Sequence, residues 1–254
     1  MTGQDAMSEE TKQIQILHAP TEAEPFLVVD KPEGLPSAPL HEGENSALTQ
    51  AMVLFPKIAA VLGRKTVEKG LVHRIDTATR GCVLIAATQS AYDFFLRAQE
   101  EGAFTKWYSA KVDYVPKLFK MVGGFSFPPI ETSDITPGKT IVVESRFRAY
   151  GKHHVGVRPV TEESGRAALK KSGDKCYRTE ITLKDKDTAV CRITAGYRHQ
   201  VRCHLAWIGL PVKNDFLYNP LCNGNFSEKL CFTAYKIAFP NPSDGSLVTI
   251  SLET

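Results

Sequence analysis

The sequence contains no apolar run close to the roughly 20 residues that a helix needs to cross a bilayer. Its polar start, MTGQDAMSEETKQ, also has no apolar core of the kind that marks a secretory signal peptide. These absences exclude membrane-spanning and secreted classes of protein. We therefore expect a cytoplasmic protein with no membrane partner.

Closely spaced cysteine pairs are absent too. None of the six cysteines belongs to a C-x-x-C pair, whereas structural zinc sites usually show such pairing. Disulfides do not persist in the reducing compartment expected for this chain. We expect reduced, mostly buried thiols and no metal site.

Signatures of nucleotide-binding and metal enzymes are incomplete. Residues 138–140 (GKT) end like a phosphate-binding P-loop, but Ser133 stands where the first glycine must be. Residues 73–76 (HRID) place the aspartate one position away from that of the kinase H-R-D loop, and no D-F-G is present. The H-x-E and P-C-x-x-C segments of zinc nucleobase deaminases are missing. We expect no nucleotide cofactor and no other cofactor.

Charge is distributed unevenly along the chain. The net charge is +3, but residues 1–60 hold nine acids and three lysines, a net of −6, so residues 61–254 carry +9. Residues 146–178 alone hold nine Lys or Arg and three acids. A basic segment suits a phosphate-rich partner, because each neutralised phosphate releases counterions. A solvated, lysine-rich surface explains the same charge, so charge alone does not establish nucleic acid binding.

Apolar periodicity predicts an α+β fold dominated by its sheet. Strands are predicted at residues 26–29, 82–87, 106–112, 140–150, 176–184, 188–195, 230–238 and 246–252. Helices are predicted at 46–62, interrupted by Pro56, at 90–101 and at 198–208. With 254 residues, 43% of them hydrophobic, the chain can bury one large core. We expect a flexible N-terminal arm over residues 1–20 and one domain over residues 21–254.

A polar segment with a carboxylate directly precedes a predicted strand. It runs from His73 to Gly81 (HRIDTATRG), and polar residues on a loop held by a rigid strand are often functional. Asp76 has Arg74 and Arg80 close by in sequence. A carboxylate beside a guanidinium stays ionised, which suits a nucleophile or an electrostatic partner. A structural ion pair is the commoner explanation for such neighbours taken alone.

A second polar segment, GYRHQVRCHL, covers residues 196–205. Two arginines, two histidines and a glutamine follow a strand-ending glycine and open a helix. Helix N-termini and guanidinium groups both favour phosphate or carboxylate. Arg198 and Arg202 lie one helical turn apart. An exposed polar turn is the alternative, but such a turn needs no comparable density of planar donors.

Four segments in the same order resemble the RluA/RsuA-type pseudouridine synthases. Residues 29–35 (VDKPEGL) are similar to the family's leading K-P-x-G segment, and residues 73–81 to its H-R-L-D-x-x-T-S-G signature. Residues 106–110 (KWYSA) are similar to its K-x-Y-x-A strand, and residues 196–218 to the segment that begins G-R-T-H-Q-I-R. The resemblance implies a central mixed, largely antiparallel sheet with flanking helices and a catalytic cleft, so that residues 21–254 form the catalytic domain.

The sequence departs from the family pattern at several positions. Arg80 replaces a small serine or threonine, and Tyr197-Arg198 replaces Arg-Thr. Residues 115–180 align only loosely. Because the first segment begins near residue 26, we expect no N-terminal RNA-binding module of the kind found in many relatives. These departures bear on substrate choice more than on chemistry.

The resemblance implies a catalytic role for three residues. Asp76 acts on the ribose of the substrate uridine, either attacking C1′ or taking a C2′ proton. Arg202 keeps Asp76 charged and oriented. Tyr108 stacks on the uracil and helps to remove its C5 proton, provided that a charge such as that of Arg202 lowers the pKa of the phenol.

A uridine inside an RNA helix must be flipped out of its stack to reach such a site. By the same resemblance, Arg74 fills the vacated space and contacts neighbouring bases or phosphates. The other residues expected to bind substrate are His73, Arg80, Arg198 and His199. In place of a separate module, we expect the basic segment 146–178 to hold the RNA.

The resulting hypothesis is an RNA pseudouridine synthase that isomerises specific uridines of structured ribosomal or transfer RNA, as a monomer and without a cofactor. The alternative is a catalytically silent RNA-binding or assembly factor on the same scaffold. The joint presence of Asp76, Tyr108 and Arg202 disfavours that alternative. A glycosidase acting on a substrate other than RNA is also disfavoured, because such enzymes generally use two carboxylates.

Overall fold

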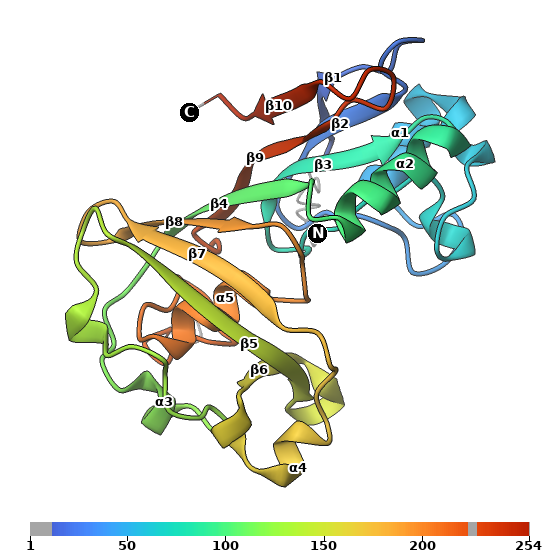
Figure 1. The fold of residues 1–254 in the computed structure, drawn as a ribbon. Coiled ribbons are helices and arrows are strands. Elements are labelled where there is room, and N and C mark those ends of the chain that lie inside the picture. Colours follow the sequence, from blue (N-terminus) through green and yellow to red (C-terminus); the bar gives the residue numbers. More distant parts are fainter. Residues whose placement is uncertain (1–11, 223–227, 254) are drawn as a thin grey trace, which may run out of the picture.

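The secondary structure follows the predicted sheet-dominated pattern (Figure 1). A computed structural model describes residues 12–222 and 228–253. Its strands are β1 (Gln15–His18), β2 (Phe26–Lys31), β3 (Arg80–Ala86), β4 (Thr105–Lys111), β5 (Thr140–Tyr150), β6 (Gly156–Val160), β7 (Tyr177–Leu183), β8 (Thr188–Ile193), β9 (Phe232–Pro240) and β10 (Leu247–Ser251). Its α-helices are α1 (Ala47–Leu54), α2 (Gln89–Glu100), α3 (Leu118–Met121), α4 (Arg166–Leu169) and α5 (Gln200–Trp207). Short 3-10 segments are η1 (Pro56–Ala60), η2 (Thr66–Glu68), η3 (Thr132–Asp134), η4 (Lys152–His154) and η5 (Glu162–Ser164).

All the named strands belong to one sheet. Its order is β1-β2-β3-β9-β4-β8-β7-β5-β6, with β10 paired to β9. Within the described ranges every named strand pair is antiparallel except β3 and β9, which run parallel and pair only at Arg80 and Gly81. The predicted α+β class with a mixed, largely antiparallel sheet is confirmed.

Local sequence signals account for most of the elements. Eight of the ten strands match the predicted strands to within two residues at each end. α1 begins where the side chain of Ser46 accepts a hydrogen bond from the backbone N–H of Thr49 at 3.1 Å. It ends before Pro56, which starts η1, because proline has no N–H to continue an α-helix.

Two strands, β1 and β6, are not predicted from the sequence. β1 lies within the expected flexible arm and pairs antiparallel with β2. This part of the arm is therefore a strand of the sheet, and its four residues were too few to reveal a period. Residues 1–11 of the arm lie outside the described residues. β6 is buried along its length but contains Arg158 and Pro159, which interrupt both an apolar run and an alternation.

The sheet joins two parts of the molecule, and β4, β8 and β9 connect them (Figure 1). β1, β2, β3 and β10 lie with α1 and α2 in one part, and β5, β6 and β7 lie with α3, α4 and α5 in the other. α2 buries Ala91, Tyr92, Phe95 and Ala98, whereas Phe94 is only partly buried. No helix of the described residues is long and apolar enough to cross a membrane.

The six cysteines are free thiols. Cys82, Cys191 and Cys203 are buried, Cys222 and Cys231 are half-buried, and Cys176 is exposed. Burial raises the pKa of the Cys82 thiol to about 12, so this group is unreactive at neutral pH. Within residues 12–222 and 228–253, no three His, Cys, Asp or Glu side chains are grouped so as to hold a metal ion.

α5 is buried along its whole length. Its residue His204 contacts both β5 and β7. Nε2 of His204 lies 2.9 Å from the hydroxyl of Ser145 on β5, and Nδ1 lies 2.8 Å from the hydroxyl of Thr179 on β7. The ring also stacks on Phe147 at 4.9 Å between centroids. Burial lowers the pKa of His204 to about 3, so the ring is neutral at pH 7. An uncharged histidine thus fixes the helix to the sheet.

We expect His204 to make the protein less stable in acid. The folded ring stays neutral down to about pH 3, whereas the unfolded ring takes up a proton near pH 6.5, so falling pH favours the unfolded chain. At pH 4.5 this removes roughly 2–3 kcal/mol of the free energy of unfolding present above pH 6.5. Urea unfolding at pH 7.5 and pH 4.5 measures the loss.

The matched variants are His204→Gln and His41→Gln. Glutamine at 204 retains hydrogen-bonding groups for Ser145 and Thr179 but does not titrate, so the difference between the two pH values should shrink. His41 is exposed, and its replacement should leave the difference unchanged. An unaltered pH dependence in His204→Gln would contradict this account.

Candidate active site

Asp76 lies on a tight turn that leads into β3. Its carbonyl accepts a hydrogen bond from the N–H of Thr79 at 2.9 Å. The next carbonyl, that of Thr77, accepts hydrogen bonds from the N–H of Gly34 at 2.7 Å and from Nζ of Lys31 at 3.2 Å. The side chain of Asp76 is 24% exposed. The turn therefore presents a partly accessible carboxylate on a backbone that the loop after β2 holds in place.

Lys31 is a buried amine that sequence reasoning did not single out, although it lies in the first family-like segment. Besides Thr77, its Nζ donates to the carbonyls of Pro32 at 2.9 Å and Leu35 at 2.6 Å. Burial lowers the pKa of Lys31 to about 8, while the charge of Asp76 opposes the shift. Lys31 thus ties the loop after β2 to the turn that carries the carboxylate.

Arg202, on α5, lies between two carboxylates. Its Nη1 donates to Oδ2 of Asp76, and its Nε and Nη2 donate to the two oxygens of Asp215, each at 2.7 Å. The Arg202 side chain is 4% exposed and Asp215 is fully buried. Burial alone lowers the pKa of Arg202, but Asp215 and Asp76 outweigh burial and raise it. The guanidinium stays charged and donates to Oδ2 of Asp76, while Oδ1 has no hydrogen bond within the described residues.

The two arginines nearest to Asp76 in sequence bind other carboxylates. Nη1 of Arg74 lies 3.2 Å from Oε1 of Glu68, and the Arg74 side chain is 60% exposed. Nε and Nη2 of Arg80 donate to Oδ2 of Asp30 at 2.9 and 2.7 Å. Neither arginine therefore pairs with Asp76, and the cation that does, Arg202, comes from α5.

Tyr108 lies on β4 with its ring against Phe232 of β9. The ring centroids are 5.1 Å apart and the planes differ by 3°. Burial raises the pKa of the Tyr108 phenol, and the charge of Asp76 raises it further. The condition under which Tyr108 could act as a base, a pKa lowered by a charge such as that of Arg202, is therefore not met. At neutral pH Tyr108 is an uncharged aromatic surface and not a base.

The start of α5 carries two more residues predicted to bind substrate. His199 has Nε2 at 3.9 Å from Oδ1 of Asp76 and Nδ1 at 2.9 Å from the hydroxyl of Tyr218. Arg198 donates instead to carbonyl oxygens at the β5–β6 turn, one of them that of Gly156 at 3.2 Å. The structure therefore brings His199, and not Arg198, to the carboxylate. Sequence reasoning overlooked Tyr218 and Asp215, although the fourth family-like segment contains both.

His73 lies inside the protein and not on its surface. Its Nε2 accepts a hydrogen bond from the N–H of Leu84 at 3.1 Å, and its ring packs edge-on against Phe104 at 5.0 Å. Burial lowers the pKa of His73 well below its ordinary value, so the ring is neutral. The structure therefore places His73, expected to bind substrate, in the interior and away from Asp76. The side chain instead supports β3, the strand that follows Asp76.

A small cleft opens beside Arg202. The side chains that line it include Glu33, Ala78, Asn214 and Leu230. Asn214 has a left-handed backbone with φ at 62°, and strained non-glycine residues of this kind cluster at functional sites. A carboxylate with one oxygen fixed by a buried guanidinium and the other open suits attack on a ligand, or proton removal from it.

The comparisons with known proteins match RNA pseudouridine synthases. A family model described as RNA pseudouridylate synthase matches residues 25–207, which include Asp76, Tyr108 and Arg202. The chain is 26% identical over 241 residues to ribosomal large subunit pseudouridine synthase D of Zymomonas mobilis, covering 91% of this chain and 67% of that protein. It is 25% identical over 226 residues to the dual-specificity RNA pseudouridine synthase RluA of Escherichia coli, covering 88% of this chain and 87% of that one.

A solved structure is similar in fold. The human protein RNA pseudouridylate synthase domain containing 1 superposes with a TM-score of 0.64 at 15% identity, covering 96% of this chain and 84% of that chain. The sequence matches and the shared fold confirm the resemblance that the four ordered segments indicated.

Proposed function

The chain belongs to the RNA pseudouridylate synthase family, and from this premise we propose that it isomerises particular uridines of a structured ribosomal or transfer RNA, with Asp76 acting on the ribose. The observation that carries the role of Asp76 is its pairing with Arg202 at 2.7 Å through Oδ2, while Oδ1 has no hydrogen bond within the described residues. Such a carboxylate is fixed in direction but still able to react.

In the proposed reaction the bond between uracil N1 and ribose C1′ breaks, the uracil turns, and a bond forms between C5 and C1′. A proton leaves C5 and one is gained at N1, so the product is an isomer of the substrate. Asp76 either attacks C1′, forming an ester bond that breaks again when C5 bonds to C1′, or takes a C2′ proton that returns to C2′ as the C5–C1′ bond forms. Tyr108 supplies a flat, uncharged surface on which the uracil stacks, in keeping with its raised pKa.

The proposal includes flipping of the target uridine out of its stack. The Asp76 side chain is only 24% exposed, so a uridine held inside an RNA helix cannot present its ribose to it. Arg74 lies two residues before Asp76, is 60% exposed and is tied to the protein by an exposed contact with Glu68. Surface pairs of this kind are weak, which leaves Arg74 able to turn toward the RNA and fill the vacated space.

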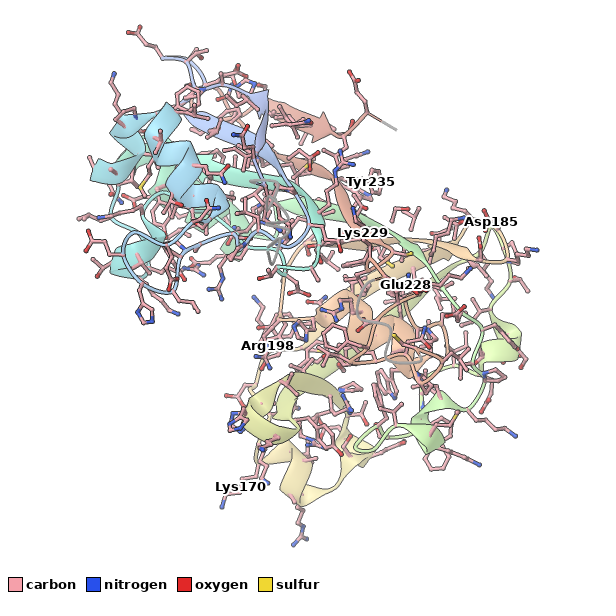
Figure 2. All side chains as sticks on the ribbon, turned by 180° about the vertical axis from the view of Figure 1, so that it is seen from behind. Lys170, Asp185, Arg198, Glu228, Lys229 and Tyr235 are labelled. Carbon is pink, nitrogen blue, oxygen red and sulfur yellow. The ribbon has the colours of Figure 1, made fainter. Side chains whose placement is uncertain are left out.

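The basic segment 146–178 offers a surface for the RNA backbone. Its exposed cations that form no ion pair within the described part of the chain are Lys152, Arg166, Lys170, Lys171 and Lys175. Arg146 and Arg178 pair with acids, and Arg158 is buried. Figure 2 shows Arg198 near the junction of the two parts of the molecule and Lys170 at the far end of the part that contains α4. Unpaired cations on that part support phosphate contacts on one side of the site.

Replacing Lys170 and Lys171 together by glutamate is expected to raise the Kd for RNA about 10- to 100-fold at moderate salt. Each phosphate contact that is lost should also reduce the slope of log affinity against log salt by about 0.7–0.9. Filter binding across a range of salt concentrations measures both quantities. The rate at saturating RNA should stay unchanged, because neither lysine contacts Asp76.

The matched control is Lys184→Glu with Lys186→Glu, which changes the net charge equally. Both lysines are exposed at the turn between β7 and β8, beside Asp185, which Figure 2 shows on the opposite side from Arg198. If both double variants weaken binding to the same degree, only overall charge matters, and a specific role for the 146–178 surface is contradicted.

Tritium release tests the proposed function itself. Wild-type protein is incubated separately with ribosomal and transfer RNA labelled with tritium at uridine C5, and released tritium is counted. Release from one pool supports the synthase and identifies its class of RNA. Binding of both pools with no release from either would instead support a catalytically silent RNA-binding protein.

The monomeric state and the cytoplasmic location stay predictions. Light scattering after size-exclusion chromatography tests the first, and fractionation of cells that produce the protein tests the second.

A further inference from the structure

The hydroxyl of Tyr218 lies in the interior between β6 and α5. It accepts a hydrogen bond from the backbone N–H of Val157 at 3.0 Å and lies 2.9 Å from Nδ1 of His199. Tyr218 is 1% exposed. Its ring also faces the guanidinium of Arg202, with 5.4 Å between that group and the ring centroid. Tyr218 therefore contacts both side chains that approach Asp76.

The chemistry of these groups fixes the direction of each hydrogen bond. A backbone N–H can only donate, so Val157 occupies one lone pair of the hydroxyl. The single hydrogen of the hydroxyl then needs an acceptor, and the neighbour that can accept it is Nδ1 of His199. The imidazole is neutral at pH 7, because burial lowers the pKa of His199, helped by Arg202 and Arg198 and opposed by Asp76 and Asp215. A neutral ring with an accepting Nδ1 carries its hydrogen on Nε2.

The hydrogen on Nε2 of His199 lies on the side of the ring that approaches Asp76. Nε2 lies 3.9 Å from Oδ1, the oxygen that Arg202 does not bind. An N–H in this position attracts the carboxylate, whereas the lone pair of the other tautomer repels it. The backbone also holds the ring in place, since His199 is left-handed with φ at 57° and its carbonyl accepts the N–H of Cys203 at 2.9 Å.

We propose that Tyr218 is a positioning residue: its hydroxyl keeps the hydrogen of His199 on Nε2, where it donates to Oδ1 of Asp76 when a uridine enters. The distance of 3.9 Å is too long for a hydrogen bond in the free protein. Contacts in active sites commonly shorten on substrate binding. The inference rests on the proposed function, because it assigns Tyr218 to the reaction of Asp76.

The kinetics of Tyr218→Phe test whether the Tyr218 hydroxyl contributes to the reaction of Asp76. Phenylalanine keeps the ring against Arg202 and removes only the hydroxyl. We expect the single-turnover rate of tritium release to fall about 10- to 100-fold, with the Kd for RNA changed less than about twofold. Tyr114→Phe alters a tyrosine that is 56% exposed and lies outside segment 146–178, and it should leave both values unchanged.

A double-variant comparison shows whether Tyr218 acts through His199. In a His199→Ala background, Tyr218→Phe should cost no further rate, because the imidazole through which it acts is gone. The same fold-loss in both backgrounds would mean that the hydroxyl only supports the fold, and would overturn the proposal. Thermal melting of each variant confirms that it is folded.

Nitrogen NMR of ¹⁵N-labelled protein reports the tautomer without reference to activity. Wild type should show a bare Nδ1 and a protonated Nε2 at His199, and Tyr218→Phe should show a mixture of tautomers. Hydrogen on Nδ1 in the wild type would overturn the proposal. If no tritium is released by the wild type, the proposed function fails, while the NMR result still decides which tautomer Tyr218 imposes.

Discussion

Asp76→Asn is expected to reduce tritium release by about 10⁴-fold or more, the scale of loss seen when a catalytic group is removed. Asparagine keeps the size of the side chain but cannot attack C1′ or take a proton from C2′. RNA binding should persist or become slightly tighter, since one negative charge leaves a site that approaches phosphates. Single-turnover release and filter binding on the same preparation measure the two effects.

Two controls test whether the lost release is due to unfolding or to the loss of any single carboxylate. Arg202 keeps both hydrogen bonds to Asp215 in the variant, so the melting temperature should change by only a few degrees. Asp93→Asn on the exposed side of α2 makes the same chemical change elsewhere and should release tritium at the wild-type rate. Residual release within tenfold of wild type would mean that Asp76 is not the catalytic carboxylate.

Arg202→Met should be the most destabilising of these substitutions. It leaves Asp215, which is fully buried, without its cation. Removing one partner of a buried ion pair typically costs about 3–5 kcal/mol, which for a chain of this size lowers Tm by on the order of 10 °C. Activity should also be lost, because Asp76 loses the group that fixes Oδ2. Urea unfolding and calorimetry measure the change in stability.

The double variant Arg202→Met with Asp215→Asn separates stability from activity. It buries no unpaired charge, so it should recover part of the lost stability while remaining inactive. The matched control is Arg192→Met, which breaks a partly exposed pair with Glu180, the two side chains being 40% and 27% exposed, and should cost on the order of 1 kcal/mol. Equal destabilisation by Arg202→Met and Arg192→Met would contradict a buried structural role for Arg202.

The sheet is largely predictable because its strands are marked by local signals. Apolar runs and alternation mark eight strands, and an N-cap at Thr88 marks α2. β6 escapes such reasoning because the environment of Arg158 is set by distant residues: its guanidinium stacks on the rings of Phe125 and Tyr150. An arginine accommodated by aromatic rings in the interior looks, in sequence, like a surface residue.

The sequence predicts which segments form the site, but it does not predict which side chains contact one another there. The family-like segments contain the side chains that pair with Asp76 and Arg202, namely His199 and Asp215. They do not reveal that Arg80 turns to Asp30 or that His73 turns inwards, because the direction of a side chain on a loop depends on what packs against it. The buried partner Asp215 is hidden for the same reason, since an acid in a turn is most often exposed.

The short parallel contact between β3 and β9 has a consequence for how the chain folds during synthesis. β9 (Phe232–Pro240) lies between β3 and β4, which are made more than a hundred residues earlier. The two backbones meet so closely that a Cβ on Gly81 would lie 2.2 Å from the carbonyl oxygen of Ala234. During synthesis, the edges of β3 and β4 that β9 will pair with therefore remain unpaired until β9 is made, for several seconds or more at ordinary rates of elongation. Unpaired edges attract other strands, so this enzyme is most prone to aggregate just before its own penultimate strand closes the gap.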